Sequence, residues 1–255
     1  MKNKLALLGK NIEHSRSPLI HSFIMNYLNI GGSYELLEFN NKLNPNYLGF
    51  NVTTPYKIEI IKYLDEITPL ARNIGAINTI YKENNKWIGT NTDYDGFKYL
   101  LEINNIDVKS KNIYILGSGG AAFAVYKVIE DLKGNPVIVT RNKQQLLNNK
   151  NHIFYDDLNP SEVDIYVQAT NINPNESVLS KAQVENHLVI ELQVNKNKTK
   201  IEQYAKSSIN GLEMLIFQAL KSAEIWFKKD IINNDIIKSL KEVIEKWILL
   251  VHYFK

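Results

Sequence analysis

A glycine-rich segment near the middle of the sequence has the residue types and the spacing of a phosphate-binding turn. Gly117, Gly119 and Ala122 form the pattern G-x-G-x-x-A directly after the apolar run of residues 112–116. Glycines at these positions permit a tight turn and a close approach of the backbone to a pyrophosphate. The positive N-terminal end of the following helix attracts the phosphates. The segment predicts a dinucleotide site, with a purely structural strand-to-helix turn as the alternative.

The end of the next strand indicates which nicotinamide cofactor binds. NAD sites place Asp or Glu about 20 residues after the first glycine, where the carboxylate holds the ribose 2′-hydroxyl. This sequence has Thr140, Arg141, Asn142 and Lys143 there, and Arg141 lies 24 residues after Gly117. A guanidinium offers a planar pair of donors to a 2′-phosphate. We therefore predict NADP rather than NAD; the alternative is a solvated loop arginine.

Four clusters of polar residues in the first hundred positions carry further side chains capable of chemistry. Each lies at a predicted junction between a strand and a helix or at a strand end, where open α/β sheets gather ligands. Taken singly, each also has a structural interpretation, because Ser, Thr, Asn and Asp cap helices and close turns. The clusters are SRS (15–17), NVTTPYK (51–57), GAINT (75–79) and NTDYDGF (91–97).

The composition excludes several classes of function. The 255 residues include no cysteine, which rules out disulfides, cysteine nucleophiles and thiolate zinc sites. The 30 Lys and Arg residues against 27 Asp and Glu are too evenly balanced for nucleic acid binding, which calls for a clustered basic face. The five histidines lack zinc spacing, and we expect His21 to pack within a helix. The apolar runs are too short for a signal peptide or a membrane span, so we expect a cytoplasmic protein.

Apolar runs that alternate with amphipathic segments predict an α/β fold. Continuous apolar strands such as 112–116 are typical of a parallel sheet covered by helices on both faces. The predicted strands are 4–8, 34–39, 48–52, 76–81, 86–90, 112–116, 136–140, 163–169 and 188–194, with a hairpin around residues 83–85. The predicted helices are 18–28, a helix that starts at 54–55, 94–103, one that follows GSGGAA to about 132, 212–227 and about 234–253.

Two helix starts are predicted from their capping residues. Ser17 followed by Pro18 has the residue types of an N-cap and a first turn, and Thr54 followed by Pro55 has the same types. The helix from residue 54 is expected to present its apolar residues, Ile58, Ile61 and Leu64, on one face.

Together these motifs resemble the shikimate dehydrogenase family in its shikimate-specific, NADP-linked form. The resemblance covers almost the whole chain, since SRSP, NVTTPYK, GAINT, NTDYDGF, GSGGAA and NGLEMLIFQA (210–219) occur in the family's order. It implies reversible reduction of 3-dehydroshikimate to shikimate with NADPH, a step of aromatic amino-acid and chorismate biosynthesis. It also implies two α/β domains with a cleft between them. We assign residues 1–100 plus 213–255 to the substrate-binding and catalytic domain and residues 101–212 to a Rossmann-type NADP-binding domain.

The resemblance further implies a role for each matching residue. Lys57 and Asp93 form the catalytic pair near the oxygen that changes oxidation state. A lysine ammonium can give the developing alkoxide its proton, and a carboxylate can orient that lysine. The residues implied for the substrate are Ser15 and Ser17 for its carboxylate, Thr53 for the lining of the same pocket, and Asn78 and Gln218 for its ring hydroxyls. The residues implied for the cofactor are Gly117, Ser118, Gly119, Gly120 and Ala121 for the pyrophosphate, Arg141 for the 2′-phosphate, Met214 near the nicotinamide, and Gly211.

Four positions on the cofactor side depart from the family's pattern. Gln168 stands where the family has Asn, and Glu191 stands where it has Asp. Val194 replaces a tyrosine whose hydroxyl normally reaches the substrate carboxylate, and Glu213 replaces a glycine. The resemblance therefore implies substrate recognition more firmly than it implies the geometry of the cofactor.

Two other interpretations stay open beside an NADP-dependent shikimate dehydrogenase. One is a dehydrogenase that also accepts quinate or uses NAD, and the other is a non-catalytic paralogue that binds shikimate-like acids. The presence of Lys57 and Asp93 favours an enzyme, because a binding protein has no need of a proton donor. We expect a small-molecule substrate as partner, with no nucleic acid and no membrane, and a monomer or homodimer.

Overall fold

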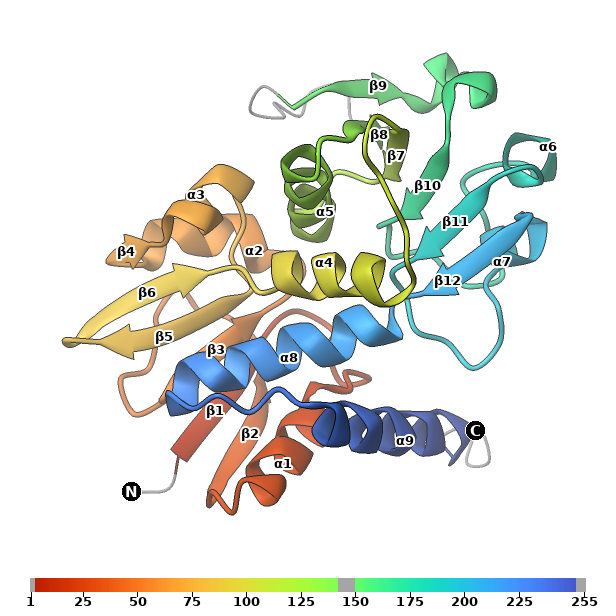
Figure 1. The fold of residues 1–255 in the computed structure, drawn as a ribbon. Helices are drawn as coiled ribbons and strands as arrows, with labels where there is room; N and C mark the ends of the chain where they lie inside the picture. The colour runs from red at the N-terminus through yellow and green to blue at the C-terminus, as the bar shows by residue number, and fades with distance from the viewer. Residues whose placement is uncertain (1–2, 142–149, 251–255) are drawn as a thin grey trace. The chain divides into compact units, whose positions relative to one another are not determined.

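The chain divides into two compact units, each built on one six-stranded sheet (Figure 1). The computed structural model describes residues 3–141 and 150–250. One unit comprises Met1–Gly96 and Leu215–Lys255, and the other comprises Phe97–Met214. The predicted α/β class is confirmed. The prediction for Asn142 and Lys143 falls outside the described residues.

The first unit contains a mixed sheet with helices on both faces. The strand order is β2-β1-β3-β5-β6-β4; β5 is antiparallel to β3 and β6, and the other pairs are parallel. Leu5 of β1 packs in the cluster that contains Trp226, whereas its neighbour Ala6 packs in the cluster around Ile60. Burial on both faces explains the continuous apolar run. The strands are β1 Asn3–Leu8, β2 Gly32–Leu37, β3 Gly49–Val52, β4 Glu66–Ile67, β5 Thr79–Glu83 and β6 Lys86–Thr90.

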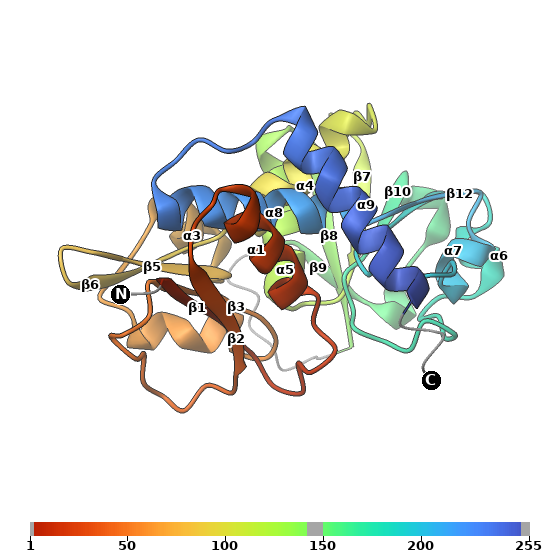
Figure 2. The ribbon, with the colours of Figure 1, turned by 90° about the horizontal axis from the view of Figure 1, so that it is seen from below.

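Helices from both ends of the sequence belong to this first unit. They are α1 Ser17–Tyr27, α2 Tyr56–Glu59, a 3₁₀ turn at Ile60–Tyr63, α3 Pro69–Ile74, most of α8 Leu212–Phe227, and α9 Asn234–Leu250. Helix α4, Asp93–Ile103, begins in this unit and continues into the second. Helices α1 and α9 lie side by side, as Figure 2 shows.

The two predicted helix starts are wrong in detail. Arg16, not Ser17, occupies the N-cap position of α1, and the Ser17 N–H donates to the Ser15 hydroxyl at 3.2 Å. The helix expected from Thr54 is the short α2 followed by the 3₁₀ turn. Ile58 is 42% exposed there, whereas Ile60 is fully buried. A 3₁₀ turn has three residues per turn instead of 3.6, so the α-helical period no longer selects the buried face.

The predicted hairpin between β5 and β6 is confirmed. Its two-residue loop consists of Asn84 and Asn85, with φ angles of 50° and 63°. Both angles lie in the left-handed region, which asparagine tolerates better than most residues and which a type I′ turn requires. Local sequence therefore fixes the register of this pair.

The sheet of the second unit is entirely parallel and has the strand order of a Rossmann domain. The order is β12-β11-β10-β7-β8-β9, so the chain starts at the central β7, builds one half outward and then returns to build the other. The strands are β7 Asn112–Leu116, β8 Asn135–Thr140, β9 His152–Phe154, β10 Ile165–Gln168, β11 Leu188–Glu191 and β12 Ser207–Asn210. The helices are α5 Gly120–Asp131, α6 Lys181–Val184 and α7 Lys200–Tyr204, with 3₁₀ turns at Tyr155–Asp157 and Pro160–Glu162.

Several short elements escaped the sequence analysis, among them α3, β4, β9 and β12. Helix α3 carries clear signals: the Thr68 hydroxyl accepts the Ala71 N–H, Pro69 begins the helix, and Gly75 ends it with a φ of 81°. Only Gly75 was noted, as part of the polar GAINT cluster, and the helix was missed because six helical residues are too few to show a period.

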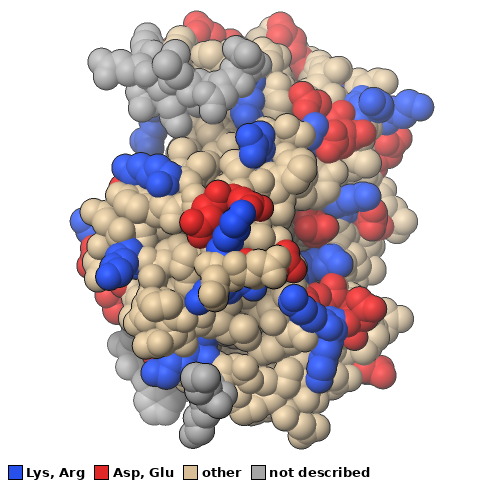
Figure 3. All heavy atoms as spheres, turned by 90° about the vertical axis from the view of Figure 1, so that its left-hand side faces the viewer, with Lys and Arg blue, Asp and Glu red and all other residues tan. Residues whose placement is uncertain are grey.

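On the face drawn in Figure 3, Lys and Arg side chains alternate with Asp and Glu side chains. A surface of interspersed charges of both signs creates no large field of one sign on that face. Within residues 3–141 and 150–250, no helix is both long and apolar enough to cross a bilayer.

Candidate functional site

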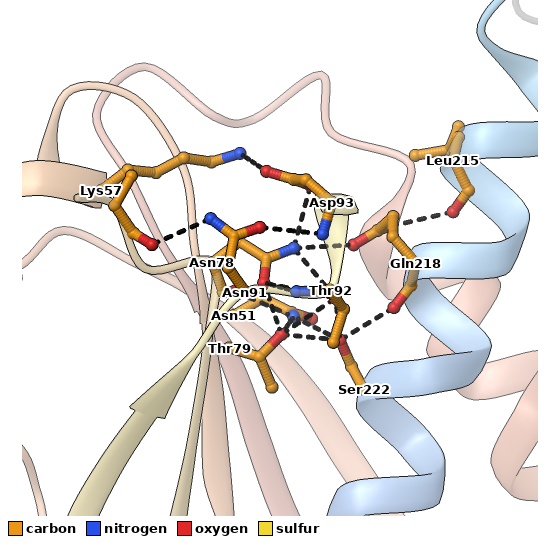
Figure 4. A network of polar contacts seen from close by, with 11 residues as sticks. Asn51, Lys57, Asn78, Thr79, Asn91, Thr92, Asp93, Leu215, Gln218 and Ser222 are labelled. Atoms are coloured by element: carbon orange, nitrogen blue, oxygen red, sulfur yellow. Dashed lines mark hydrogen bonds and ion pairs between the residues drawn. The ribbon is translucent and has the colours of Figure 1, made fainter. Parts of the chain in front are cut away.

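Lys57 and Asp93 form an ion pair in the first unit (Figure 4). Lys57 Nζ lies 2.5 Å from Asp93 Oδ2, and the side chains are 14% and 8% exposed. Lys57 lies in α2 just after β3, and its carbonyl accepts the Ile77 N–H at 2.7 Å. Asp93 opens α4, where the helix N-terminus favours a carboxylate, and its N–H donates to Asn91 Oδ1. The Lys57 ammonium, which can donate a proton, is thus held against a carboxylate in a position that is mostly buried from water.

Asn78 and Gln218 lie beside this pair. Asn78 Nδ2 is 2.9 Å from Asp93 Oδ1, 3.0 Å from Thr92 Oγ1 and 3.4 Å from Gln218 Oε1. Gln218 belongs to α8, 140 residues after Asn78 in the chain. The structure therefore brings four of the predicted site residues, Lys57, Asp93, Asn78 and Gln218, into one hydrogen-bonded group.

A second layer of buried polar side chains, which the sequence analysis missed as functional residues, lies behind Asn78. Asn51 Nδ2 donates to the Asn78 carbonyl at 3.2 Å and to Ser222 Oγ at 3.1 Å. Thr79 Oγ1 lies 2.9 Å from Asn78 Oδ1, and the Thr92 N–H donates to the same oxygen at 2.7 Å. Asn51, Thr79 and Thr92 are members of the polar clusters, so their positions were a usable signal. Ser222 belongs to none of them.

These contacts determine which way the Asn78 amide faces. Two donors, the Thr92 N–H and the Thr79 hydroxyl, meet one end of the amide, which must therefore be its oxygen. The nitrogen then faces the Asp93 carboxylate and Gln218. Asn78 consequently presents N–H donors on the same side as the lysine.

The predicted carboxylate-binding serines lie at the start of α1. The Ser15 and Ser17 hydroxyls are 3.2 Å apart. Arg16 between them lies 5.3 Å over the ring of Trp247 in α9, and burial lowers the pKa of its guanidinium. Thr53 follows β3, and its N–H donates to the carbonyl of Leu8 at 2.9 Å. Thr53 thus lies beside the end of β1, the strand that precedes the segment with Ser15 and Ser17.

Tyr34 connects the serine pair with the second layer. Its buried hydroxyl donates to Asn51 Oδ1 at 2.7 Å. Burial raises the pKa of Tyr34, and a hydrogen bond with the Ser17 hydroxyl counters part of the rise. His21 stacks on the Tyr34 ring at 4.4 Å, and burial lowers the pKa of this histidine to about 3. The expected packing role of His21 is confirmed, since it is neutral and enclosed.

The glycine-rich turn in the second unit has room for a phosphate group. Gly117 has a φ of 118°, and a Cβ there would lie 2.9 Å from the Thr170 side chain. Gly119 is the N-cap of α5, and a Cβ there would meet nothing within 4 Å. The first amides of a helix have no acceptor within the helix, so those of α5 at Gly120 and Ala121 are suited to a phosphate. These features fit the pyrophosphate of a dinucleotide.

Arg141 lies at the same edge of the parallel sheet as this turn. It directly follows β8, which neighbours β7, and the Gly117 N–H donates to the carbonyl of Val139 at 2.9 Å. Ser118 Oγ and Thr140 Oγ1 are 3.2 Å apart. Arg141 is exposed, so its guanidinium is accessible to a phosphate of a ligand bound at the turn.

Gly211 directly follows β12, at the same carboxyl edge of the parallel sheet as the glycine-rich turn, and Met214 lies in the first turn of α8. A Cβ on Gly211 would lie 2.3 Å from the carbonyl oxygen of Leu192, so only glycine allows this approach of two backbones. Met214 is buried. Glu213, one of the four departures, lies in the first turn of α8.

Two of the other three departures lie at the ends of neighbouring strands in this second unit, and the third follows one of these strands. Gln168 and Glu191 are in register on β10 and β11, and both are buried. Burial raises the pKa of Glu191 to about 7, although its carboxylate accepts the Gln193 N–H and the Thr199 hydroxyl. Val194 is buried but lies beyond β11, which ends at Glu191, so the predicted strand 188–194 is three residues too long.

A metal site requires several acidic or histidine side chains close together. The described part of the chain contains no group of three or more such side chains suited to a metal.

Comparison with known proteins identifies similar sequences along nearly the whole chain. A family model described as the shikimate dehydrogenase substrate binding domain matches residues 7–80. A relative from Clostridium botulinum (strain Loch Maree / Type A3), named shikimate dehydrogenase (NADP(+)), is 35% identical over 249 residues. The alignment covers 86% of this chain and 95% of the relative.

Solved structures show the same arrangement of elements. Shikimate dehydrogenase 1 from Peptoclostridium difficile is 34% identical with a TM-score of 0.87, over 95% of this chain and 98% of that one. Shikimate 5-dehydrogenase from Listeria monocytogenes, solved in complex with shikimate and NAD, is 25% identical with a TM-score of 0.79. That match covers 95% of this chain and 96% of the other.

Proposed function

The chain belongs to the shikimate dehydrogenase family, and on that premise we propose that it catalyses the reversible reduction of 3-dehydroshikimate to shikimate with NADPH. The observation that carries the proposal is the Lys57–Asp93 ion pair, with Asn78 Nδ2 donating to the same carboxylate. A ketone reduction requires a proton at the oxygen, and this is the one reagent that a nicotinamide cofactor does not provide.

Lys57 supplies that proton. The cofactor, when bound, provides the hydride for the carbonyl carbon. Negative charge then develops on the oxygen, and the Lys57 ammonium stabilises this charge and donates a proton to it. Asp93 holds the lysine in place through its Oδ2 atom. In the reverse direction Lys57 accepts the proton from the hydroxyl.

The remaining polar residues of the first unit bind and orient the substrate. Ser15 and Ser17 donate to the substrate carboxylate beside Thr53, while Asn78 and Gln218 bind its ring hydroxyls. The support for these roles is the group of hydrogen bonds that joins Asn78 and Gln218 to the ion pair. Hydrogen bonds to a charged group are stronger than neutral ones, so the serines provide much of the affinity for the acid.

NADP binds at the glycine-rich turn of the second unit in this proposal. The segment Gly117–Ala121 receives the pyrophosphate, and Arg141 pairs with the 2′-phosphate. Gly211 and Met214 lie on the cofactor side as well. The support is the open space at Gly119 and the exposed guanidinium next to the turn. We propose the same two domains as above: residues 1–100 and 213–255 bind the substrate, and residues 101–212 bind NADP.

One set of assays tests the proposal. Purified protein is incubated with shikimate or quinate, each with NADP or NAD, and the absorbance of the reduced nicotinamide is recorded. We expect the highest kcat/KM with shikimate and NADP. Equal rates with quinate or NAD would indicate instead a dehydrogenase that also accepts quinate or uses NAD. Binding of shikimate without turnover in any combination would indicate a non-catalytic paralogue. A cytoplasmic location and a monomeric or homodimeric state remain predictions from the sequence.

A further inference from the structure

Ser222 lies at the centre of the second layer although it belongs to none of the sequence motifs. It is fully buried in α8, one helical turn after Gln218. Its hydroxyl donates to the Gln218 carbonyl at 3.0 Å and accepts from Asn51 Nδ2 at 3.1 Å. It also lies 2.8 Å from Thr79 Oγ1 and 3.1 Å from Thr92 Oγ1. One hydroxyl therefore joins the turn of α8 that bears Gln218 to three residues around Asn78.

The donors and acceptors in this group allow few arrangements of the protons. A serine hydroxyl has one proton and two lone pairs. The Gln218 carbonyl can only accept and the Asn51 amide nitrogen can only donate, so contacts with these two partners use the proton and one lone pair of Ser222. Ser222 Oγ is the nearest of three acceptors around Asn51 Nδ2, at 3.1 Å, against 3.2 Å for the Asn78 carbonyl and 3.3 Å for Thr79 Oγ1. The other lone pair accepts from the hydroxyl of Thr79 or of Thr92.

The count of donors and acceptors also includes the side-chain amide of Asn78. Whichever threonine donates to Ser222, the other remains free to donate to Asn78 Oδ1, which lies 2.9 Å from Thr79 Oγ1 and 3.2 Å from Thr92 Oγ1. With the Thr92 N–H, this oxygen has two donors in either arrangement. The Thr92 N–H alone sets the direction of the Asn78 amide, and Ser222 determines which of the two threonine hydroxyls is the second donor to its oxygen.

We propose that Ser222 is a positioning residue for substrate binding, which acts through Asn78 and Gln218 and does not touch the substrate. The role rests on the proposed function, because Asn78 and Gln218 are its proposed ligands for the ring hydroxyls. Loss of the Ser222 hydroxyl frees the turn that bears Gln218 from the second layer. It also removes the nearest of the three acceptors around Asn51 Nδ2 and an acceptor shared by the hydroxyls of Thr79 and Thr92. Both effects loosen the donors that meet the substrate.

The decisive experiment compares Ser222→Thr with Ser222→Val. These side chains have nearly the same shape, so any strain from the added bulk is common to both, and only threonine keeps the hydroxyl. We expect KM for shikimate to be about tenfold higher in Ser222→Val than in Ser222→Thr, which corresponds to the upper end of the net contribution of one buried hydrogen bond. We expect kcat to differ by less than about threefold and KM for NADP to be the same. Equal KM values for shikimate in the two variants would overturn the proposal.

Ser222→Ala and Thr68→Ala provide a second, independent comparison that adds no bulk. The Thr68 hydroxyl of the same unit caps α3 and bonds the Thr90 hydroxyl, and neither of these partners is a side chain of the proposed site. Ser222→Ala should raise KM for shikimate, whereas Thr68→Ala should lower the melting temperature alone. A Ser222→Ala protein with a lower melting temperature and an unchanged KM would show a merely structural role and overturn the inference. A wild-type protein without turnover would instead refute the proposed function, and this role with it.

Discussion

Removal of the Lys57 charge is the most direct test of the mechanism. Lys57→Met keeps most of the aliphatic stem and its packing, while it removes the ammonium that lies 2.5 Å from Asp93 Oδ2. The proposed mechanism makes this ammonium the proton donor, so the variant should lose transition-state stabilisation more than substrate affinity. The expected result is a large fall in kcat with a small change in KM for shikimate.

The structure narrows the expected size of the fall in kcat for Lys57→Met. General acid–base help is worth about 10²–10⁴-fold, or roughly 3–5 kcal/mol. The neutral donor nearest to the pair is Asn78 Nδ2, which already lies within 3.4 Å of three acceptors. A neutral, shared N–H is a poor replacement for a cation that can release its proton. We therefore expect a fall in the upper half of the range, about 10³–10⁴-fold.

The same substitution affects stability to a smaller extent. Breaking a buried ion pair from one side costs about 3–5 kcal/mol, because the partner is left uncompensated. Asp93 keeps Asn78 as a donor and lies in the first turn of α4, where the helix end stabilises a carboxylate. We expect the free energy of unfolding to fall by about 2 kcal/mol, so the variant should remain folded during the assay.

Lys62→Met is the matched control. Lys62 is 63% exposed and lies 3.4 Å from Glu59 in an ion pair of the same unit. Exposed pairs of this kind contribute under about 1 kcal/mol, so both kinetics and stability should stay near wild type. Steady-state kinetics with shikimate and NADP and urea unfolding of all three proteins provide the measurements. A Lys57→Met protein with kcat within about threefold of wild type would remove Lys57 from the role of proton donor.

Four further predictions address the other proposed roles. Ser15→Ala and Ser17→Ala should each raise KM for shikimate by about 10- to 100-fold, the scale of ~1.5–3 kcal/mol for a hydrogen bond to a charged group; unchanged KM values in both would place the anion elsewhere. Arg141→Ala should raise KM for NADP and leave KM for NAD nearly unaltered, since only NADP has the 2′-phosphate, and an equal effect on both cofactors would contradict this. Val194→Tyr should lower KM for shikimate if the ring fits, against an overpacking risk of ~1–3 kcal/mol; an unchanged melting temperature together with an unchanged KM would refute the vacant contact. Burial raises the pKa of Glu191 from 4.5 to about 7. Between pH 4.5 and 7 the folded state therefore binds more protons than the unfolded chain. The free energy of unfolding falls as the pH rises through this range, by about 3 kcal/mol at most. Glu191→Gln should be less pH-dependent than wild type over pH 4.5–7 in urea unfolding, and identical profiles would show that Glu191 titrates normally.

Sequence alone predicted the elements whose signals are local and long. Strand β7 was predicted with its observed bounds, Asn112–Leu116, and so was α8, Leu212–Phe227. A five-residue apolar run before GSGGAA and a sixteen-residue amphipathic helix leave little choice of structure. The short segments α2 and α3 were misjudged or missed, because four to six residues do not reveal a period and their conformation follows from tertiary packing.

The candidate site shows the same division between local and distant information. Lys57 and Asp93 could be named because each belongs to a recognisable motif. The contact between Asn51 and Ser222 joins residues 171 positions apart, and no local pattern marks Ser222 among the other polar residues of α8. A single hydroxyl contributes to the site only when the fold buries it among donors and acceptors that must form their hydrogen bonds with one another.

The distances around Asn78 indicate how a substrate hydroxyl can enter this closed network at low cost. Asn78 Nδ2 has two protons but three acceptor neighbours, at 2.9 Å from Asp93, 3.0 Å from Thr92 and 3.4 Å from Gln218. The contact with Gln218 is the longest and therefore the weakest of the three. In the proposed mode of binding, we expect a ring hydroxyl to exchange this poor hydrogen bond for two better ones, from Asn78 to the hydroxyl and from the hydroxyl to Gln218. The contacts that orient Asn78 toward Asp93 do not involve Gln218, so we expect substrate binding to leave the ion pair with Lys57 in place.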